Sequence, residues 1–225
     1  EQFQTIDRSI AGDERPYASL PRLRANGRYR AGPDGRWQYD LDAELVNFDR
    51  DVGVRGWRAD LAPRLALDYA QPGYYLRPEA GVRYTRYALR ETASATDPVR
   101  TLPFASVDAG FLFENTNRAS ALRVTLEPRL LYLWTPYRDQ NALPVFDTAI
   151  PDLDFVQLFR SNRYVGADRV SDANQASIGF TSQVFARDSG RRLLSATLGQ
   201  TVYFETPRVR LPDEPAARRT KSDLV

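Results

Sequence analysis

Apolar and polar residues alternate over unusually long stretches of this sequence, and this alternation limits the possible folds more than any other feature. A period of two places successive side chains on opposite faces of a strand, whereas a helix needs a period of 3.6. No long window of the sequence keeps the helical period. In residues 121–135 the apolar face comprises Leu122, Val124, Leu126, Pro128, Leu130, Tyr132 and Trp134. The sequence therefore predicts an all-β chain.

The alternating stretches divide the chain into eight expected strands. They run over residues 18–30, 37–48, 56–69, 74–88, 102–114, 121–135, 175–187 and 191–204. Strands of soluble sheets usually have about 5–6 residues, whereas a tilted strand needs about 9–11 residues to cross a bilayer. The lengths therefore predict an antiparallel up-and-down transmembrane β-barrel, with about eight strands in a meander.

Two further features favour a membrane barrel over a soluble β-sandwich, whose strands also alternate. Aromatic residues gather near the strand ends, as they do in the girdles at the two interfaces of a membrane barrel. They are Trp37, Tyr39, Trp57, Tyr69, Tyr74, Tyr75, Tyr84, Tyr132, Trp134 and Phe204. Connections also alternate between short and long, except that the one near 49–55 is short. This is the pattern of outer-membrane barrels, and it assigns the long loop 136–174 to the extracellular rim.

Charged residues on the polar faces indicate how neighbouring strands pair. The expected pairs are Arg28 with Asp40, Arg24 with Glu44, Arg64 with Glu79, and Asp60 with Arg83. Opposite charges across two strands contribute roughly 0.2–1 kcal/mol per pair, and a slip of one residue would turn every charge towards lipid. We expect these residues to form a charged wall of the lumen. For 102–114 and 121–135 the sequence favours no register.

Five prolines stand on the apolar sides of the expected strands, at positions 21, 63, 78, 103 and 128. Proline has no backbone N–H and so removes one ladder donor. In a bilayer the partner carbonyl left unpaired would cost several kcal/mol. We therefore expect a bulge or a bend in the strand at each of these positions.

Composition excludes several classes of function. With 31 basic and 29 acidic residues, the net charge of +2 gives no basic excess for binding nucleic acid. The chain has no Cys and no His, which excludes disulfides, thiolate metal sites and Ser–His or Cys–His catalysis within it. It also lacks Met, including an initiator, so we expect a fragment or a processed chain. No apolar run approaches the roughly 20 residues of a transmembrane helix.

Carboxylates are the remaining candidates for chemistry. Asp147, Asp152 and Asp154 cluster in the long loop, and paired carboxylates can perform acid–base catalysis or bind calcium. The glycine and the ligand spacing of an EF-hand are absent. A solvated loop is the better interpretation, so we predict no catalytic, cofactor-binding or metal-binding residue, and no enzyme.

Three irregular blocks in a fixed order resemble the LptD family of LPS-assembly proteins, also called organic solvent tolerance proteins. They are TLEPRLLYLWTPYRDQ, LFRSNRYVGADRVSDANQ and LGQTVYFE, and RPYASLPRL and RTLPFASVDAGFLFE match more loosely. The resemblance implies a large β-barrel in the Gram-negative outer membrane that releases lipopolysaccharide into the outer leaflet. It also implies an LptE-type lipoprotein plug, and a periplasmic LptA-type bridge that delivers lipopolysaccharide through a jellyroll domain.

No segment of the chain matches that jellyroll, and no aromatic strand ends the chain. We therefore expect residues 1–225 to be an internal fragment of one barrel domain, without the strands of the lateral gate. Its outward faces would contact outer-membrane lipid. Because both sheet edges would be unpaired, such a slice should need the remaining strands.

The resemblance also carries over a loop signature. It comprises Tyr137, Arg138, Asp139, Gln140, Phe159, Arg160, Arg163, Tyr164, Gly166, Asp168, Arg169, Asp172, Asn174 and Gln175. Two roles remain open for these residues: they cap the lumen and touch the plug, or they pin the long loop to itself. For the whole chain, two alternatives to a lipopolysaccharide translocon also remain, namely a passive porin-like barrel and a soluble β-sandwich binding module.

Overall fold

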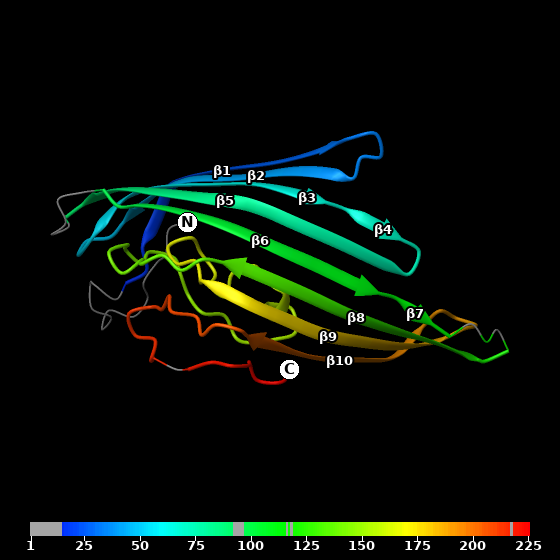
Figure 1. Ribbon diagram of the computed structural model, residues 1–225. Coiled ribbons are helices and arrows are strands. Elements are labelled where there is room, and N and C mark those ends of the chain that lie inside the picture. Colours follow the sequence, from blue (N-terminus) through cyan, green and yellow to red (C-terminus); the bar gives the residue numbers. More distant parts are fainter. Residues whose placement is uncertain (1–14, 92–96, 116, 118, 217) are drawn as a thin grey trace.

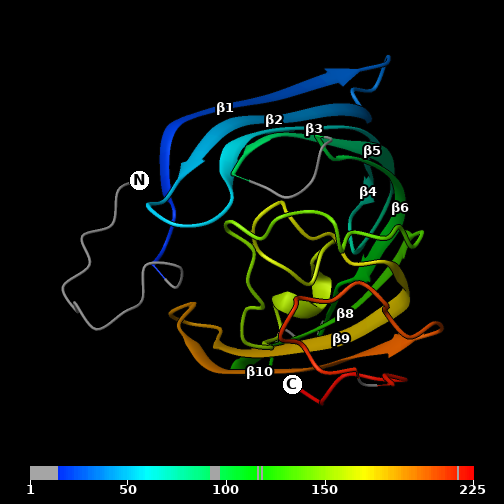
Figure 2. The same ribbon diagram turned by 90° about the vertical axis from the view of Figure 1, so that its left-hand side faces the viewer.

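The computed structural model contains one antiparallel sheet that curves around a hollow (Figures 1 and 2). It describes residues 15–91, 97–115, 117, 119–216 and 218–225. The strands are β1 (Ala18–Ala31), β2 (Trp37–Asp49), β3 (Arg55–Leu67), β4 (Tyr69–Gln71), β5 (Tyr74–Arg90), β6 (Val99–Phe111), β7 (Phe113–Glu114), β8 (Leu122–Thr135), β9 (Ala173–Ala186) and β10 (Arg192–Tyr203). One short 3-10 helix, η1 (Gln157–Phe159), lies between β8 and β9.

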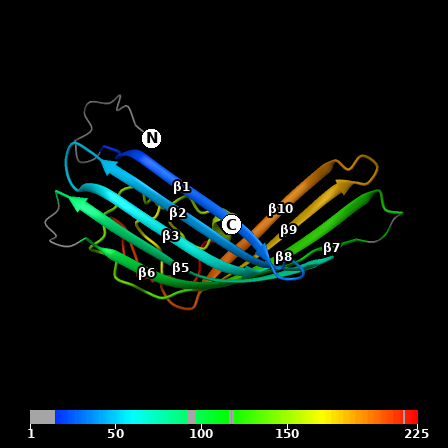
Figure 3. The ribbon, with the colours of Figure 1, turned by 90° about the horizontal axis from the view of Figure 1, so that it is seen from above.

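The strands follow one another across the sheet in the order in which they occur in the chain. The order is β1-β2-β3-β5-β6-β8-β9-β10, with β4 and β7 as short continuations that pair with β5 and β8. Strand direction rotates from β1 to β10 (Figure 3), as the right-handed twist of strands requires. The predicted all-β up-and-down meander is confirmed, and the sheet is open, as a segment of a larger barrel should be. The sandwich alternative is wrong for the described residues, which form one sheet.

The two faces of the sheet invert the usual distribution of side chains. Large apolar residues such as Leu23, Leu130 and Phe180 are exposed on the convex face, whereas Arg58 and Thr85 are buried on the concave one. Soluble proteins bury their apolar side chains, but a membrane barrel presents them to lipid and keeps a polar interior. Within the described residues, no helix combines the length and the apolar character that crossing a bilayer requires.

The register of the first hairpin is confirmed. Arg28 lies opposite Asp40, and Arg24 lies opposite Glu44. Between β6 and β8, where the sequence favoured no register, Gly110 lies opposite Arg129.

The register expected for the second hairpin is wrong by two residues. Arg64 lies opposite Gly81 rather than Glu79, and Asp60 lies opposite Thr85. Alternation cannot detect this error, because a shift of two residues leaves every side chain on its own face. The turn decides the register: Gln71 pairs with Tyr74, so Pro72 and Gly73 alone form the loop. Gly73 has a φ of +91°, which suits the glycine position of a Pro–Gly turn.

The bulges expected at the strand prolines occur at one position of five. The register shifts between Ser19 and Arg22, on either side of Pro21. The other four prolines lie in unshifted strands and each pairs with one neighbour: Pro63 with Leu41, Pro78 with Val107, Pro103 with Val82, and Pro128 with Phe180.

On its other side each of these four prolines has no paired residue. In an antiparallel strand the N–H and C=O of one residue point to the same neighbour. A proline therefore opens one ladder locally and leaves the other intact, so no extra residue has to be inserted. No bulge occurs at these four positions, so that part of the expectation was wrong, and a bend in the strand stays a prediction.

Close packing at Gly81 leads to a prediction. A Cβ atom there would lie 2.6 Å from Phe104 Cζ and 2.7 Å from the backbone oxygen of Pro63, and overpacking of this kind costs about 1–3 kcal/mol. Gly81→Ala in the full-length protein should reduce the fraction that migrates as a folded barrel on unheated gels. Gly27→Ala is the matched control, because its nearest atom, Leu41 Cβ, is 4.0 Å away. Equal folded fractions for the two variants would contradict the prediction.

Candidate functional site

The connection between β8 and β9, residues 136–172, folds into the hollow of the sheet (Figure 2). Loop residues Leu158 and Tyr164 are buried, and loop side chains bond to β3, β5 and β6. The loop begins where the sequence predicted and ends two residues earlier, because Ala173 and Asn174 already belong to β9.

Asp168 is the most enclosed polar residue of this loop, with 0% of its surface exposed. Its carboxylate accepts hydrogen bonds from Arg58 Nη1 at 2.6 Å and from the Tyr87 hydroxyl at 2.9 Å. The backbone N–H groups of Phe146 and Asp147 donate to it at 2.7 and 2.9 Å. Four donors from three segments of the chain therefore converge on one carboxylate, which compensates for its burial.

Arg58 provides the matching positive charge. It projects from β3, is 1% exposed, and contacts Glu44 at 2.7 Å, Asp147 at 2.7 Å and Asp168 at 2.6 Å. Arg22 adds a second cation, 2.7 Å from Asp147. We call Arg22, Glu44, Arg58, Asp147 and Asp168 the inner ion cluster. Burying several charges is costly unless each one has an oppositely charged partner. The pairing within the inner ion cluster therefore restricts the loop to few positions on the sheet.

A second set of contacts, in which the acceptors are uncharged, holds the loop beside the inner ion cluster. Arg100 of β6 donates to Gln140 Oε1 at 2.7 Å and to the backbone oxygens of Ala167 and Asp168 at 2.7 and 2.8 Å. Phe146 stacks on Phe48 of β2 with 4.5 Å between ring centroids. The loop is therefore attached through charge, hydrogen bonds and aromatic packing.

The loop is also tied to the segment that follows β10. Arg163 Nη1 lies 2.6 Å from Glu214, and the Tyr164 hydroxyl donates to Val209 O at 2.8 Å. The carboxylate of Asp172 accepts the backbone N–H of Val209 at 2.9 Å. The β8–β9 loop and the segment that follows β10 are thus held together by direct contacts.

Several ionisable groups of these connections have displaced pKa values. Burial favours the neutral form of Asp147, but the hydrogen bond and charge of Arg58 outweigh it, so the pKa of Asp147 is lowered. The pKa of Glu214 is lowered in the same way against its burial, by Arg163 and Tyr164. Burial raises the pKa of the Tyr164 hydroxyl and lowers that of Arg169. Both carboxylates are thus held ionised by their partners.

The signature residues divide into three groups. Those that hold the loop are Gln140, Arg163, Tyr164, Asp168, Arg169 and Asp172. Those at the periphery are Tyr137, Arg138, Asp139 and Arg160. The remaining four have separate positions. Phe159 lies under the Arg129 guanidinium, Gly166 adopts a φ of +78°, Asn174 bonds Tyr132 and Glu205, and Gln175 lies opposite Leu133.

Three of the four predicted lumen pairs are in contact. Arg28 bonds Asp40 at 2.8 Å and Arg24 bonds Glu44 at 2.7 Å. Asp60 and Arg83 lie 2.8 Å apart although they are not directly opposite. The fourth pair is wrong, because the two-residue change of register removes Glu79 from Arg64. Arg64 instead bonds Asp42, and Glu79 lies 3.6 Å from Arg77.

The three carboxylates considered for chemistry do not converge. Asp147 belongs to the inner ion cluster, Asp154 Oδ1 accepts the N–H of Gln157 at 2.7 Å, and Asp152 is exposed. Among the described residues, no group of three or more His, Cys, Asp or Glu is placed to hold a metal ion.

Sequence reasoning missed Tyr87 and Arg100 as partners of the loop. Tyr87 stands at a concave-face position of β5. An aromatic residue among the polar residues of that face is the feature of the sequence that could have indicated its role. Arg100 lay outside the expected strand 102–114, whereas β6 begins at Val99.

The comparisons with known proteins agree over the whole chain. The family described as "LptD: LPS transport system D" matches residues 1–225. The LPS-assembly protein LptD of Nitrosococcus oceani is 44% identical over 231 residues, which cover 99% of this chain and 31% of the relative. The proteins of the same name from Thiobacillus denitrificans and Aromatoleum aromaticum are 36% and 38% identical over 100% of this chain, and the match covers 31% and 29% of their lengths. The chain thus spans less than a third of these relatives.

Removing the charge of Asp168 should release the loop. Asp168→Asn leaves Arg58 with Glu44 and Asp147 but weakens the charged hydrogen bonds that converge on residue 168, which costs about 2–3 kcal/mol. In the full-length protein, cleavage between residues 136 and 172 by added protease should become faster. Asp152→Asn is the matched control, because it removes an exposed carboxylate of the same loop. Equal cleavage rates for the two variants would show that the ion pair does not hold the loop.

Acid should detach the loop as well. The pKa values of Asp147 and Glu214 are lowered from ordinary values of 3.8 and 4.5. Their contribution to stability is fully present above about pH 5 and is lost as the pH falls through the lowered values. A nitroxide on Ala149→Cys, in a background without other reactive thiols, should stay immobile down to about pH 5 and become mobile as the pH falls below the ordinary aspartate value of 3.8. Asp147→Asn should remove part of this transition, and an unchanged spectrum at pH 3 would contradict the assignment.

Proposed function

Because the chain belongs to the LptD family, we propose that it forms part of the wall of an outer-membrane β-barrel that assembles lipopolysaccharide. Residues 1–225 would then lie within one barrel domain, and the strands of the remaining chain would close the sheet between β1 and β10. The whole protein would act in the outer membrane of a Gram-negative bacterium and deliver lipopolysaccharide to the outer leaflet.

The observation that carries this proposal is the inverted sheet with a loop bound in its hollow. Its convex face exposes apolar side chains such as Leu41, Leu61 and Leu126, which suits acyl chains. Its concave face presents Arg and Asp side chains, which suit phosphates and sugars. A lipid with a large polar head group needs both environments side by side. We assign no covalent chemistry to this chain.

A passive porin-like barrel is the second candidate. Porins keep a water-filled lumen, whereas other barrels are plugged by loops or by an additional element. Here the inner ion cluster binds the loop 136–172 to the concave face, which favours a plugged barrel. The position of the long connections at one rim also supports an extracellular location for this loop.

The proposed partners follow from family membership. They are lipopolysaccharide, an LptE-type lipoprotein plug, and a periplasmic LptA-type bridge that would act through a jellyroll domain outside this chain. One local feature supports the plug. Ile150 and Leu153 on the loop are 48% and 46% exposed and line the same cavity, and apolar side chains exposed together mark protein contact sites.

Depletion of the full-length protein tests the function. Lipopolysaccharide made after depletion should fail to reach the cell surface, as measured with a membrane-impermeant label on intact cells. A porin would give a different result, namely normal surface lipopolysaccharide and slower entry of small hydrophilic solutes. That second result would overturn the proposal.

A further inference from the structure

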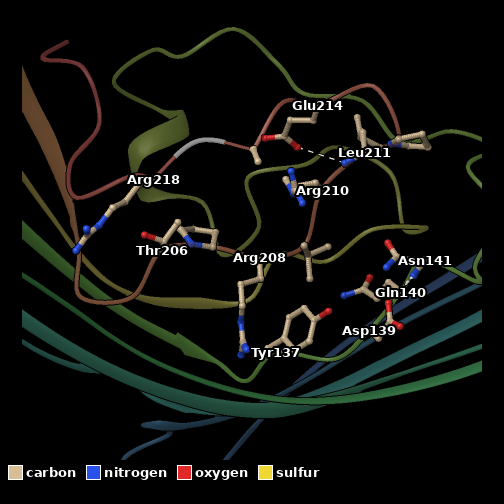
Figure 4. Close-up of a pocket in the computed structure, with 14 residues that line it drawn as sticks. Tyr137, Asp139, Gln140, Asn141, Thr206, Arg208, Arg210, Leu211, Glu214 and Arg218 are labelled. Atoms are coloured by element: carbon tan, nitrogen blue, oxygen red, sulfur yellow. Dashed lines mark hydrogen bonds between the residues drawn. The ribbon is translucent and has the colours of Figure 1, made fainter.

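A cavity of about 730 Å³ lies between the start of the β8–β9 loop and the segment that follows β10 (Figure 4). Tyr137, Asp139 and Asn141 form one wall, and residues of the segment after β10, among them Thr206, Arg208, Arg210 and Arg218, form the other. β8 and β10 are both antiparallel to β9, so both walls lie at the rim of the long connections. No residue of the inner ion cluster lines this cavity.

The walls of the cavity are fixed by hydrogen bonds. Asp172 accepts the backbone N–H groups of Arg208 and Val209, each at 2.9 Å. Glu214 accepts an Arg163 N–H at 2.6 Å and lies 2.9 Å from the Tyr164 hydroxyl. A site whose walls are already held in place loses little conformational entropy when a ligand binds.

Two arginines of the lining have no ion-pair partner among the described residues. Arg210 and Arg218 are exposed, and no carboxylate among the described residues lies within ion-pair distance of either. Arg208 is held with its guanidinium 4.0 Å from the centre of the Tyr137 ring (Figure 4) and 3.7 Å from Asp172. Guanidinium groups bind phosphate through paired N–H donors.

The rest of the lining suits hydroxyl groups. Asp139 accepts the N–H of Asn141 at 3.0 Å, which leaves further acceptor positions on its carboxylate. The side chains of Asn141 and Thr206 add amide and hydroxyl groups. A free phosphate ion would be repelled by Asp139, whereas a sugar hydroxyl can donate to it. The volume falls in the range of about 300–1,000 Å³ that is typical of small-ligand sites.

We infer that this cavity binds an anionic saccharide, with phosphate groups at Arg210 and at Arg218 and hydroxyl groups at Asp139, Asn141 and Thr206. The inference deepens the proposed function and rests on it, because a barrel that passes lipopolysaccharide would meet phosphorylated sugars at this rim. The cavity would hold the sugar portion of the molecule after it has left the hollow.

Binding to the full-length protein in lipid nanodiscs tests the inference. The probe is the phosphorylated oligosaccharide released from lipopolysaccharide by mild acid, observed by saturation-transfer NMR. Arg210→Ala combined with Arg218→Ala should weaken its binding at least about tenfold, since both phosphate donors are lost. The control is Arg191→Ala, an exposed arginine in the turn between β9 and β10 at the opposite rim. It should bind as the parent protein does.

Two further probes identify the recognised group. The same oligosaccharide treated with phosphatase, and inorganic phosphate alone, should each bind at least about tenfold more weakly. Phosphate that binds as tightly as the oligosaccharide would show that the cavity recognises an anion without recognising the sugar. That result would overturn the inference. Absence of oligosaccharide binding to the parent protein, or equal binding by the double variant, would overturn it as well.

The two proposals can fail separately. If depletion blocks surface lipopolysaccharide but the double variant binds the probe normally, the saccharide site is wrong and the assembly function stands. If the probe binds as expected but depletion leaves surface lipopolysaccharide unchanged, the site stands without that function.

Discussion

The carboxylates around Arg58 hold together two parts of the molecule that the strand pairing alone would leave separate. Arg58 belongs to the wall, and two of its partners, Asp147 and Asp168, belong to the loop. An inward-facing charge in a membrane barrel needs either water or a partner. Here the loop supplies the partners and the wall supplies the cation. The position of the loop therefore depends on complementary charges buried on both sides of the contact.

The contacts between the loop and the segment after β10 depend on the position that this ion pairing gives to the loop. Once Asp168 is fixed, the chain after it brings Asp172 to the backbone of Val209, and the chain before it brings Arg163 to Glu214. The segment after β10 is thereby joined to a loop that begins at β8. The basic cavity between them exists because both of its walls are held by this sequence of contacts.

The sequence predicted the strands well because the alternation is a local property of the chain. Two expected strands are each divided, at Asp68 and at Leu112, and β6 begins three residues early. The register of the second hairpin could not be predicted from charges, because Arg64 finds a carboxylate at Asp42 as readily as at Glu79. The prolines were misjudged for a related reason, since one missing donor disturbs one ladder and does not require an inserted residue.

By itself the sequence determined the all-β class, the meander, the inverted faces and the family, because these depend on periodicity and on short blocks of residues. Only the tertiary structure decided that the loop lies in the hollow, that Tyr87 and Arg100 hold it, and that two distant connections enclose a cavity. These contacts join residues far apart in the chain, such as Arg58 and Asp168. No local pattern specifies such a pairing, because any inward arginine has the same signature until the fold brings one particular carboxylate to it.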